Sequence, residues 1–281
     1  MHIFDNKENL NSYLSSISST NATIGFVPTM GALHAGHLSL LKKSEAKNAI
    51  TVVSIFVNPT QFNNQEDLAK YPRTLDEDVE KIKTISKKII IYTPTVEDIY
   101  GKNTTSTHFN FDGLENQMEG KFRPGHFDGV GTVVKKLFEI VKPTFAYFGE
   151  KDFQQLQIVR KLVAKYKLNV TVVGCEIFRE PHGLAMSSRN ERLLKEDRKE
   201  ALIIYKTLVS AKELFGTKTA NEVSSYVKKV FKNQAKFKLE YFEIADEQTL
   251  KTCKRKSKTK NYRAFIAVFV NNIRLIDTLS L

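Results

Sequence analysis

Short apolar runs alternate with segments of helical periodicity over the first two-thirds of the chain. The apolar, β-branched runs predict strands at residues 23–27, 50–57, 89–92, 144–148 and 170–173. Apolar residues at helical spacing predict helices at residues 38–49, 75–88, 130–141 and 153–165. Strands that alternate with helices of about ten to fifteen residues are typical of βαβ units and a parallel sheet. Right-handed crossovers then cover both faces of the sheet, and ligands bind beyond the carboxyl ends of its strands.

The pattern changes in the last third of the chain. Residues 196–215 and 220–235 predict two helices, and residues 239–244 and 263–270 predict two strands on either side of a lysine-rich loop. Helices followed by an antiparallel pair of strands favour a small α+β domain. We therefore predict an α/β fold, with a Rossmann-like parallel-sheet domain over residues 1–177 and a smaller α+β domain over residues 178–281.

Length and composition fit this organisation. The chain has 281 residues, of which 41% are hydrophobic, enough for one large domain or two modest ones. No apolar run approaches the roughly 20 residues that a membrane span needs, and the N-terminus lacks the basic start and apolar core of a signal peptide. Cys175 and Cys253 form neither a metal-ligand spacing nor a disulfide framework. We expect a soluble, cytoplasmic protein with no membrane partner.

The charge raises the question of a polyanionic partner. The formal net charge is +12, and one dense basic cluster consists of Lys251, Lys254, Arg255, Lys256, Lys258, Lys260 and Arg263. A nucleic-acid-binding protein is one interpretation of such a charge. However, the cluster contains no aromatic residue before Tyr262, so it lacks the interleaved stacking residues of single-strand binders. We favour a solvated surface loop over residues 251–263 and expect no nucleic-acid partner.

The string PTMGALHAGH at residues 28–37 is the first candidate for chemistry. It follows the first predicted strand of the sheet, and His34 and His37 lie three residues apart at a helix start, where they can face the same side. Free amides and the helix dipole favour an anion there, and Gly36 lets a phosphate approach the backbone. A metal site or two buried core histidines are the alternatives. The position directly after a strand favours phosphate.

Further polar segments also follow predicted strands, at residues 58–62, 149–152 and 186–190. Lys151 supplies a mobile positive charge, Asp152 can accept hydrogen bonds from a ribose diol, and Arg189 supplies a planar fork suited to phosphate. Taken singly, the Lys151–Asp152 pair could be a surface ion pair and Ser187 a helix cap. Their convergence at one edge of the sheet favours a nucleotide site.

At this point a family resemblance appears. The strings that carry it are PTMGALHAGH at residues 28–37, VSIFVNP at 53–59, YPRT at 71–74, RPGHF at 123–127, FGEKD at 148–152, MSSRN at 186–190, FEIAD at 242–246 and RLID at 274–277. In this order they closely resemble the pantoate–β-alanine ligase family, nearly end to end. The histidine motif alone is shared with the wider superfamily of nucleotidylyltransferases and class I aminoacyl-tRNA synthetases.

The resemblance implies a Rossmann-like domain, a C-terminal lid domain and a homodimer. It implies two steps, in which pantoate attacks the α-phosphorus of ATP to give pantoyl adenylate and pyrophosphate, and β-alanine then displaces AMP to form pantothenate. Mg²⁺ would accompany ATP. A nucleotidylyltransferase remains the alternative within the same fold, although Gln61, Gln155 and the string at residues 123–127 argue against it.

Site residues follow from the resemblance position by position. The implied ATP-binding residues are Met30, Gly31, Ala32, Leu33, His34, Ala35, Gly36, His37, Gly149, Glu150, Lys151, Asp152, Phe178, Met186, Ser187, Ser188 and Arg189. Gln61 and Gln155 would bind pantoate, and Gln61, Asn58, Tyr71, Arg123 and His126 would line the β-alanine region. The implied catalytic residues are His37 as proton donor, His34 as its partner, Lys151 and Arg189.

Some positions depart from the family pattern. Ala35 stands where an acidic residue is frequent, Thr60 where methionine is common, and His182 where aspartate is common. Phe178 replaces a small aliphatic residue at the implied adenine edge. No residue is assigned to the metal, since the acidic run at residues 76–78 is more typical of a solvated helix start.

Overall fold

Two units make up the structure, a computed structural model that describes residues 1–18 and 21–281. The N-terminal unit comprises Met1–Glu115, Gly120–Gly149 and Gln155–Cys175. The C-terminal unit comprises Glu176–Leu281 and two short segments from earlier in the chain, Asn116–Glu119 and Glu150–Gln154. The main division therefore falls between Cys175 and Glu176, and the separate domains expected on either side of residue 177 stay a prediction.

A six-stranded sheet forms the centre of the N-terminal unit. Its strands are β1 (Ile3–Phe4), β2 (Ile24–Thr29), β3 (Ile50–Ile55), β4 (Ile90–Tyr92), β5 (Phe145–Gly149) and β6 (Thr171–Cys175). They lie in the order β1-β4-β3-β2-β5-β6, and the pairings between them are parallel, which confirms the expected fold class. The order reverses between β2 and β5, the place where open α/β sheets bind their ligands.

Helices connect these strands. Their bounds are α1 (Lys7–Ile17), α2 (Ala35–Glu45), α3 (Gln65–Ala69), α4 (Leu75–Lys83), α5 (Val96–Tyr100), α6 (Met118–Phe122), α7 (His126–Val141) and α8 (Phe153–Tyr166). The segments that belong to the C-terminal unit include the start of α6 and of α8. The sequence prediction missed β1 and α1, because β1 is only two residues long and α1 buries only Leu10 and Leu14.

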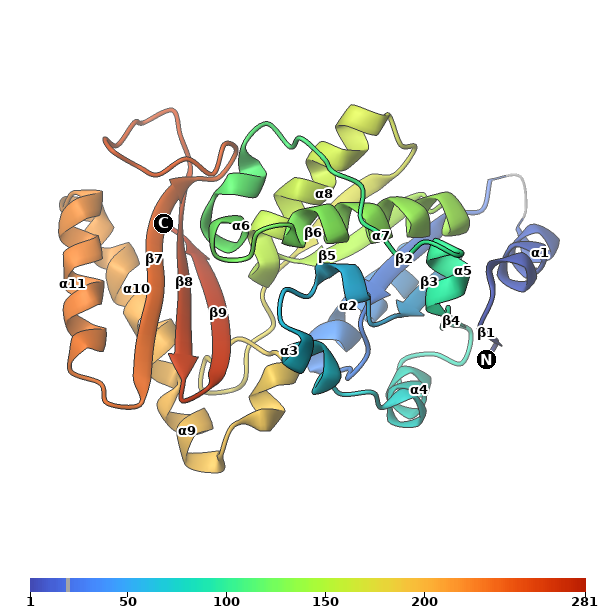
Figure 1. Ribbon diagram of the computed structural model, residues 1–281, viewed down its shortest axis with the longest axis horizontal. Coiled ribbons are helices and arrows are strands. Elements are labelled where there is room, and N and C mark those ends of the chain that lie inside the picture. The colour runs from blue at the N-terminus through green and yellow to red at the C-terminus, as the bar shows by residue number, and fades with distance from the viewer. Residues whose placement is uncertain (19–20) are drawn as a thin grey trace. The chain divides into compact units, whose positions relative to one another are not determined.

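Alternating strand residues divide the core of this unit between the two faces of the sheet. One face carries Val27, Val53, Ile91 and Tyr147, which cluster with Leu41 of α2 and Ile82 of α4. On the other face, Phe26 and Phe148 each meet Phe138 of α7 edge to face. Figure 1 shows α7 and α8 on one side of the central strands and α2 on the other. Burial on both faces is why these strands are continuous apolar runs.

The C-terminal unit packs helices against an antiparallel sheet. Its elements are α9 (Lys195–Glu200), α10 (Leu202–Thr217), α11 (Ala220–Lys232), β7 (Phe237–Asp246), β8 (Tyr262–Val270) and β9 (Ile273–Ser280), and the strand order is β7-β8-β9. One cluster joins Leu208 of α10, Val227 of α11 and Ile266 of β8. Thus α10 and α11 cover one face of the sheet, as the orange and red elements of Figure 1 show.

Two details of this unit differ from the sequence prediction. The helix expected over residues 196–215 is broken at Ala201, which ends α9 and precedes α10. The expected pair of strands is a three-stranded sheet, because β8 and β9 form a hairpin across Asn271 and Asn272. Asn271 has a φ of 52°, a left-handed conformation that asparagine tolerates better than most residues. Two asparagines between apolar runs were the available signal for this turn.

Two arginines bind the early segments to the rest of the C-terminal unit. Arg274 of β9 donates to both carboxylate oxygens of Glu119, at 2.7 and 2.8 Å. Arg263 of β8 donates to Glu150 at 3.2 Å and to Glu247 at 2.9 Å. Arg263 is only 6% exposed, so its assignment to a solvated loop was wrong. It belongs to a buried strand and is paired there with acidic residues.

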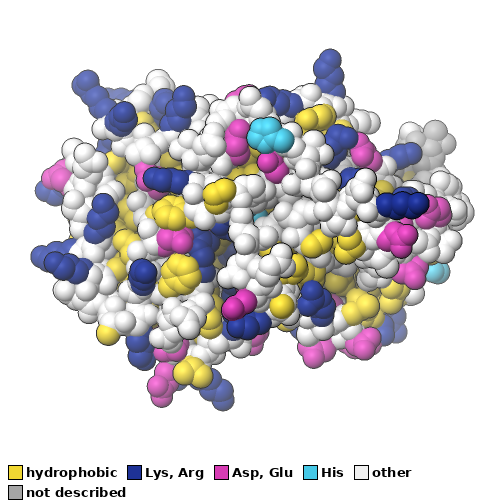
Figure 2. Space-filling model, viewed as in Figure 1, with side chains coloured by type: hydrophobic (Ala, Val, Ile, Leu, Met, Phe, Trp, Pro, Cys, Tyr) yellow, Lys and Arg dark blue, Asp and Glu magenta, His cyan; other side chains and the backbone are white. Residues whose placement is uncertain are grey.

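The rest of the basic cluster lies on the surface. Residues 254–261 are all exposed, as expected for a solvated loop. Figure 2 shows Lys and Arg side chains scattered over the visible face, interspersed with acidic and apolar ones. In the part of the chain that is described, no helix combines the length and the apolar character needed to cross a membrane.

Candidate active site

The phosphate-loop candidate begins where β2 ends. The Thr29 hydroxyl donates to the Ser54 carbonyl at 2.7 Å and accepts from the Gly31 amide at 3.2 Å. Gly31 has a φ of +82° and Ala32 a φ of 49°, so the chain makes a left-handed turn directly after the strand. Glycine adopts this conformation readily, but alanine does so at a steric cost. The turn therefore needs support from its surroundings.

Asp78 supplies that support. Its carboxylate accepts hydrogen bonds from the Ala32 amide at 2.9 Å and the Leu33 amide at 2.7 Å. The side chain is fully buried in the first turn of α4, so its assignment to a solvated helix start was wrong. Burial raises the pKa of Asp78 above its ordinary value, although the two amide hydrogen bonds act in the opposite direction. The signal in the sequence was its position on the apolar stripe of Val79 and Ile82.

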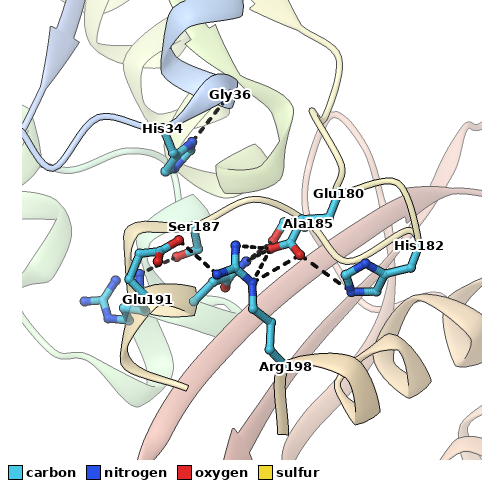
Figure 3. Close-up of polar contacts among 10 residues, drawn as sticks. His34, Gly36, Glu180, His182, Ala185, Ser187, Glu191 and Arg198 are labelled. Atoms are coloured by element: carbon cyan, nitrogen blue, oxygen red, sulfur yellow. Dashed lines mark hydrogen bonds and ion pairs between the residues drawn. The ribbon is translucent and has the colours of Figure 1, made fainter. Parts of the chain in front are cut away.

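The two histidines of the motif cap α2 with their rings. His34 is the N-cap residue, and its Nδ1 accepts from the Gly36 amide at 3.1 Å, the contact drawn in Figure 3. In return, the His34 amide donates to Nδ1 of His37 at 3.3 Å. The ring centroids are 4.0 Å apart. Because each Nδ1 accepts a hydrogen bond, the proton of each neutral ring lies on Nε2.

This geometry gives the start of α2 the properties of an anion site. Both imidazoles present an Nε2–H donor, and the N-terminal end of the helix adds the positive end of its dipole. β2, from which the loop leaves, is one of the two strands between which the sheet order reverses. Donors placed in this way can stabilise negative charge that develops on phosphoryl oxygens.

A second group of predicted residues surrounds Gln61. Its side-chain oxygen accepts from Asn58 at 3.1 Å, and its side-chain nitrogen donates to the sulfur of Met30 at 3.0 Å. Its backbone carbonyl accepts from Nδ1 of His126 at 2.9 Å and from Arg123 at 3.4 Å. The structure thus brings these five residues together. Met30 belongs to residues 28–37, the histidine loop, and so links Gln61 to that loop.

Residues 58–62, the Gln61 segment, are held in place by contacts with α5 and α7. Asn58, which is 1% exposed, donates to the Gly129 carbonyl at 3.2 Å and accepts from the Tyr100 hydroxyl at 2.6 Å. A Cβ atom at Gly129 would lie 2.4 Å from the Thr60 carbonyl oxygen, so only glycine permits this approach. Sequence reasoning missed the roles of Tyr100 and Gly129, because neither pairing partner is near in the chain.

The other predicted substrate residues of this unit have simpler surroundings. Tyr71 is buried and meets Phe62, the residue after Gln61, edge to face at 5.7 Å between ring centroids. Gln155 lies in the first turn of α8 and is half-buried. Gly149 ends β5, and no heavy atom lies within 4 Å of the place where its Cβ would be. A ligand can therefore approach the backbone at Gly149 closely.

In the C-terminal unit, the predicted residues occupy two loops. Lys151 and Asp152 form an ion pair at 3.1 Å, and Glu150 accepts from Arg263. In the second loop, the Ser187 hydroxyl accepts from the Arg189 amide at 3.3 Å and begins a 3₁₀ turn, Ser188–Arg192. The pairing expected of a helix cap is thus present there, alongside any role in binding.

Glu180 holds the second loop in place. Its carboxylate accepts from Asn190 at 3.0 Å. It also forms a two-oxygen pair with Arg198, and His182 lies 3.6 Å away; Figure 3 shows Arg198 and His182 pointing toward Glu180. Asn190 also donates to the Ala185 carbonyl at 3.1 Å. Burial alone would raise the pKa of Glu180, but the hydrogen bonds from Arg198 and Asn190 lower it below the ordinary value.

Phe178 and Met186 meet through their backbones. The Met186 amide donates to the Phe178 carbonyl at 3.0 Å, and the Phe178 ring is 43% exposed. Among the described residues, no group of three or more His, Cys, Asp or Glu side chains could hold a metal ion. The ligands of Mg²⁺ thus stay unassigned, as they were from the sequence.

Comparisons with known proteins decide the family. The family model of pantoate–β-alanine ligases matches residues 2–280. The chain belongs to the pantoate–β-alanine ligase family. The pantothenate synthetase of Flavobacterium psychrophilum is 68% identical over 281 residues, which is 100% of each chain. That of Christiangramia forsetii is 53% identical and covers 100% of this chain and 99% of its own.

Solved structures of ligases from this family agree with the fold. The pantothenate synthetase from Thermus thermophilus superposes with a TM-score of 0.90 at 36% identity, over 99% of both chains. A pantoate–β-alanine ligase from Francisella tularensis, solved with β,γ-ATP and β-alanine, gives a TM-score of 0.80 at 35% identity, over 100% of this chain and 97% of its own. The family expected from the sequence is confirmed, while the role of each site residue stays a prediction.

Proposed function

We propose that this pantoate–β-alanine ligase forms pantothenate through a pantoyl-adenylate intermediate. The observation that carries the proposal is the histidine pair at the start of α2, whose Nδ1 atoms are both occupied by backbone amides. The N–H of each neutral ring is therefore on Nε2, at the N-terminal end of a helix that follows one of the strands where the sheet order reverses. Such an arrangement suits a reaction in which negative charge moves onto pyrophosphate.

In the first step, a carboxylate oxygen of pantoate attacks the α-phosphorus of ATP, and the bond to pyrophosphate breaks. We assign His37, with His34, to donating hydrogen bonds to the phosphoryl oxygens as the leaving group gains charge. Lys151 and Arg189 are assigned to the same phosphates as cations, and Ser187 and Ser188 as hydroxyl and amide donors. Asp152 is assigned to the ribose diol as a hydrogen-bond acceptor, and the other implied ATP-binding residues to backbone and apolar contacts.

In the second step, the amine of β-alanine attacks the acyl carbon and AMP leaves. Gln61 is assigned to pantoate, together with Gln155, since an amide can donate to a carboxylate and accept from a hydroxyl. Arg123 and His126 both donate to the Gln61 carbonyl, which supports a role in holding Gln61 in position. Asn58 and Tyr71 are assigned to the same region. The Francisella tularensis relative was solved in complex with β,γ-ATP and β-alanine.

Mg²⁺ is proposed to arrive with ATP. In proteins, Mg²⁺ usually keeps several of its water ligands and is bound by the phosphates of the substrate and by one or two carboxylates. The histidines at residues 34 and 37 suit the negative charge of the ATP phosphates. Asp78 does not suit the metal, since both of its oxygens already accept hydrogen bonds from the Ala32 and Leu33 amides. When bound, the ion would neutralise phosphate charge. A homodimer, a lid role for the C-terminal unit and a cytoplasmic location also stay proposals.

The test supplies MgATP, pantoate and β-alanine to the purified chain and follows AMP, pyrophosphate and pantothenate. The adenylate is tested separately by omitting β-alanine and measuring pantoate-dependent exchange of labelled pyrophosphate into ATP. We expect both reactions. AMP formation that ignores pantoate would contradict the ligase, and pantothenate synthesis without any exchange would contradict the two-step route.

A further inference from the structure

The carboxylate of Asp78 lies at the one place where the histidine loop departs from ordinary backbone geometry. Gly31 and Ala32 both have positive φ, and the two amides that follow this bend, those of Ala32 and Leu33, donate to Asp78. Leu33 is buried, and the next residue is His34, the N-cap of α2. The Leu33 amide, which binds Asp78, is therefore only one residue before the first histidine.

The contact joins segments that are far apart in the chain. Asp78 belongs to the first turn of α4, 45 residues after Leu33. The space around Gly31 is also filled, because a Cβ atom there would lie 3.0 Å from Ile55 and 3.2 Å from an Asp78 oxygen. A buried carboxylate needs hydrogen bonds to stay charged, and backbone amides supply charge-assisted ones. The loop and the carboxylate thus stabilise each other.

We propose that Asp78 is a positioning residue for adenylation, which sets the left-handed turn and through it the direction of the His34 and His37 rings. This inference rests on the proposed function of the histidine pair. Asp78 itself touches no substrate in the proposed site, since both of its oxygens face the loop amides. Its effect passes through the Leu33 amide to the His34 backbone, and from there to both ring contacts.

The proposal predicts a defect confined to one half-reaction. Without the carboxylate, the strained turn relaxes and the two Nε2–H donors lose their fixed direction. A displacement of about 1 Å of a catalytic group can cost on the order of 100-fold in rate. Pyrophosphate exchange should therefore slow much more than the reaction of preformed pantoyl adenylate with β-alanine. The defect should lower kcat and leave the KM for β-alanine unchanged.

The decisive variant is Asp78→Asn, which keeps the size of the side chain but turns one acceptor into a donor that faces an amide. Asp76→Asn is the matched control, because Asp76 lies in the same helical turn and is exposed. We expect pyrophosphate exchange to fall about 10- to 100-fold in the first variant and to stay within about twofold in the second. Equal losses in both half-reactions would overturn the proposal. So would an altered Mg²⁺ requirement, since it would make Asp78 a metal ligand.

A second readout needs no activity. In the wild-type chain, ¹⁵N spectra of the histidine rings should show His34 and His37 protonated on Nε2, and Asp78→Asn should convert them to a tautomer mixture. Unchanged spectra would overturn the positioning role. Should the variant fold poorly, hydrogen exchange of the wild-type chain replaces it: the Ala32 and Leu33 amides should be protected although they lie in a loop, and fast exchange of both would contradict the proposal. A wild-type chain without pantoate-dependent exchange would instead refute the proposed function alone.

Discussion

At the scale of single residues, the choice of ring nitrogen decides what the histidines can do. His34 and His37 use Nδ1 to accept from the backbone at the start of α2, so Nε2 is the donor of each neutral ring. His126 has the opposite arrangement, because its Nδ1 faces the Gln61 carbonyl and must donate. Chemically identical side chains thus carry their N–H on opposite ring nitrogens, which suits His34 and His37 to the proposed phosphate contacts and His126 to holding the Gln61 carbonyl.

Removal of one donor tests this assignment. His37→Ala should lower the rate of adenylation by about 10²- to 10⁴-fold, the usual range for loss of a general acid. Single-turnover measurement of pyrophosphate release reports the step directly. His108→Ala is the control, since the His108 side chain is 87% exposed. An activity within tenfold of wild type in His37→Ala would remove His37 from its role as proton donor.

At the scale of elements, close contact between α7 and the Gln61 segment is a requirement of the fold. Gly129→Ala would place a Cβ atom 2.4 Å from the Thr60 carbonyl oxygen. We expect the free energy of unfolding to fall by about 1–3 kcal/mol, the usual cost of overpacking. The KM for pantoate should rise as well, because Gln61 moves with Thr60. Urea denaturation and initial-rate kinetics measure the two effects.

A helical glycine with open space around it is the control for this substitution. Gly216 lies in α10, and no heavy atom is within 4 Å of the place where its Cβ would be. Gly216→Ala should therefore raise the free energy of unfolding by roughly 0.5–1 kcal/mol, since alanine favours the helix. Equal destabilisation by both substitutions would show that the Thr60 contact is not the cause.

The Glu180 network predicts a pH dependence of stability. The pKa of Glu180 lies below its ordinary value near 4.5, so its contribution to stability is fully present above that pH. It is lost as the pH falls through the lowered pKa. Glu180→Gln should therefore destabilise the chain near pH 7, and the difference from wild type should shrink below pH 4.5. Urea midpoints measured from about pH 3 to 7 check this; a constant difference would contradict it.

How far the sequence predicts these elements depends on the range of the interaction. The parallel sheet, α2 and its histidines followed from local periodicity and motif position, because buried strands and helix starts leave local patterns. Asp78, Tyr100 and Gly129 did not follow, because their partners lie far away in the chain. A charged residue on an apolar stripe, such as Asp78, is the local trace of such a partner.

At the scale of the whole molecule, the net charge of +12 is a property of the surface. Lys254, Arg255 and Lys258 are exposed in the basic loop, whereas Lys256 also lies over the Phe215 ring, 4.0 Å from its centroid, and donates to the Phe215 carbonyl. Lys260 pairs with Asp246 at 3.4 Å, so the loop combines lysines that have structural contacts with lysines that are solvated.

Removal of the positive charges of this loop tests whether they contribute to turnover. Replacement of Lys254, Arg255, Lys256 and Lys258 by Gln should leave turnover within about twofold and lower thermal stability only slightly, through loss of the Lys256 contact. Turnover and thermal unfolding are measured side by side, with Lys256→Gln alone as the control for stability. A large loss of turnover would contradict the interpretation of a solvated loop.

The short segments Asn116–Glu119 and Glu150–Gln154 give the second unit an order of assembly. They precede Arg263 and Arg274 in the chain, so Glu119 and Glu150 are synthesised before the arginines that bind them. A fragment that begins at Glu176 would lack Glu119, so the half-buried Arg274 would keep Glu240 as its acidic partner and lose its two hydrogen bonds to Glu119. Division of the chain between Cys175 and Glu176 should therefore lower the stability of the C-terminal unit. Two gene fragments divided at that position should not yield two independently folded halves.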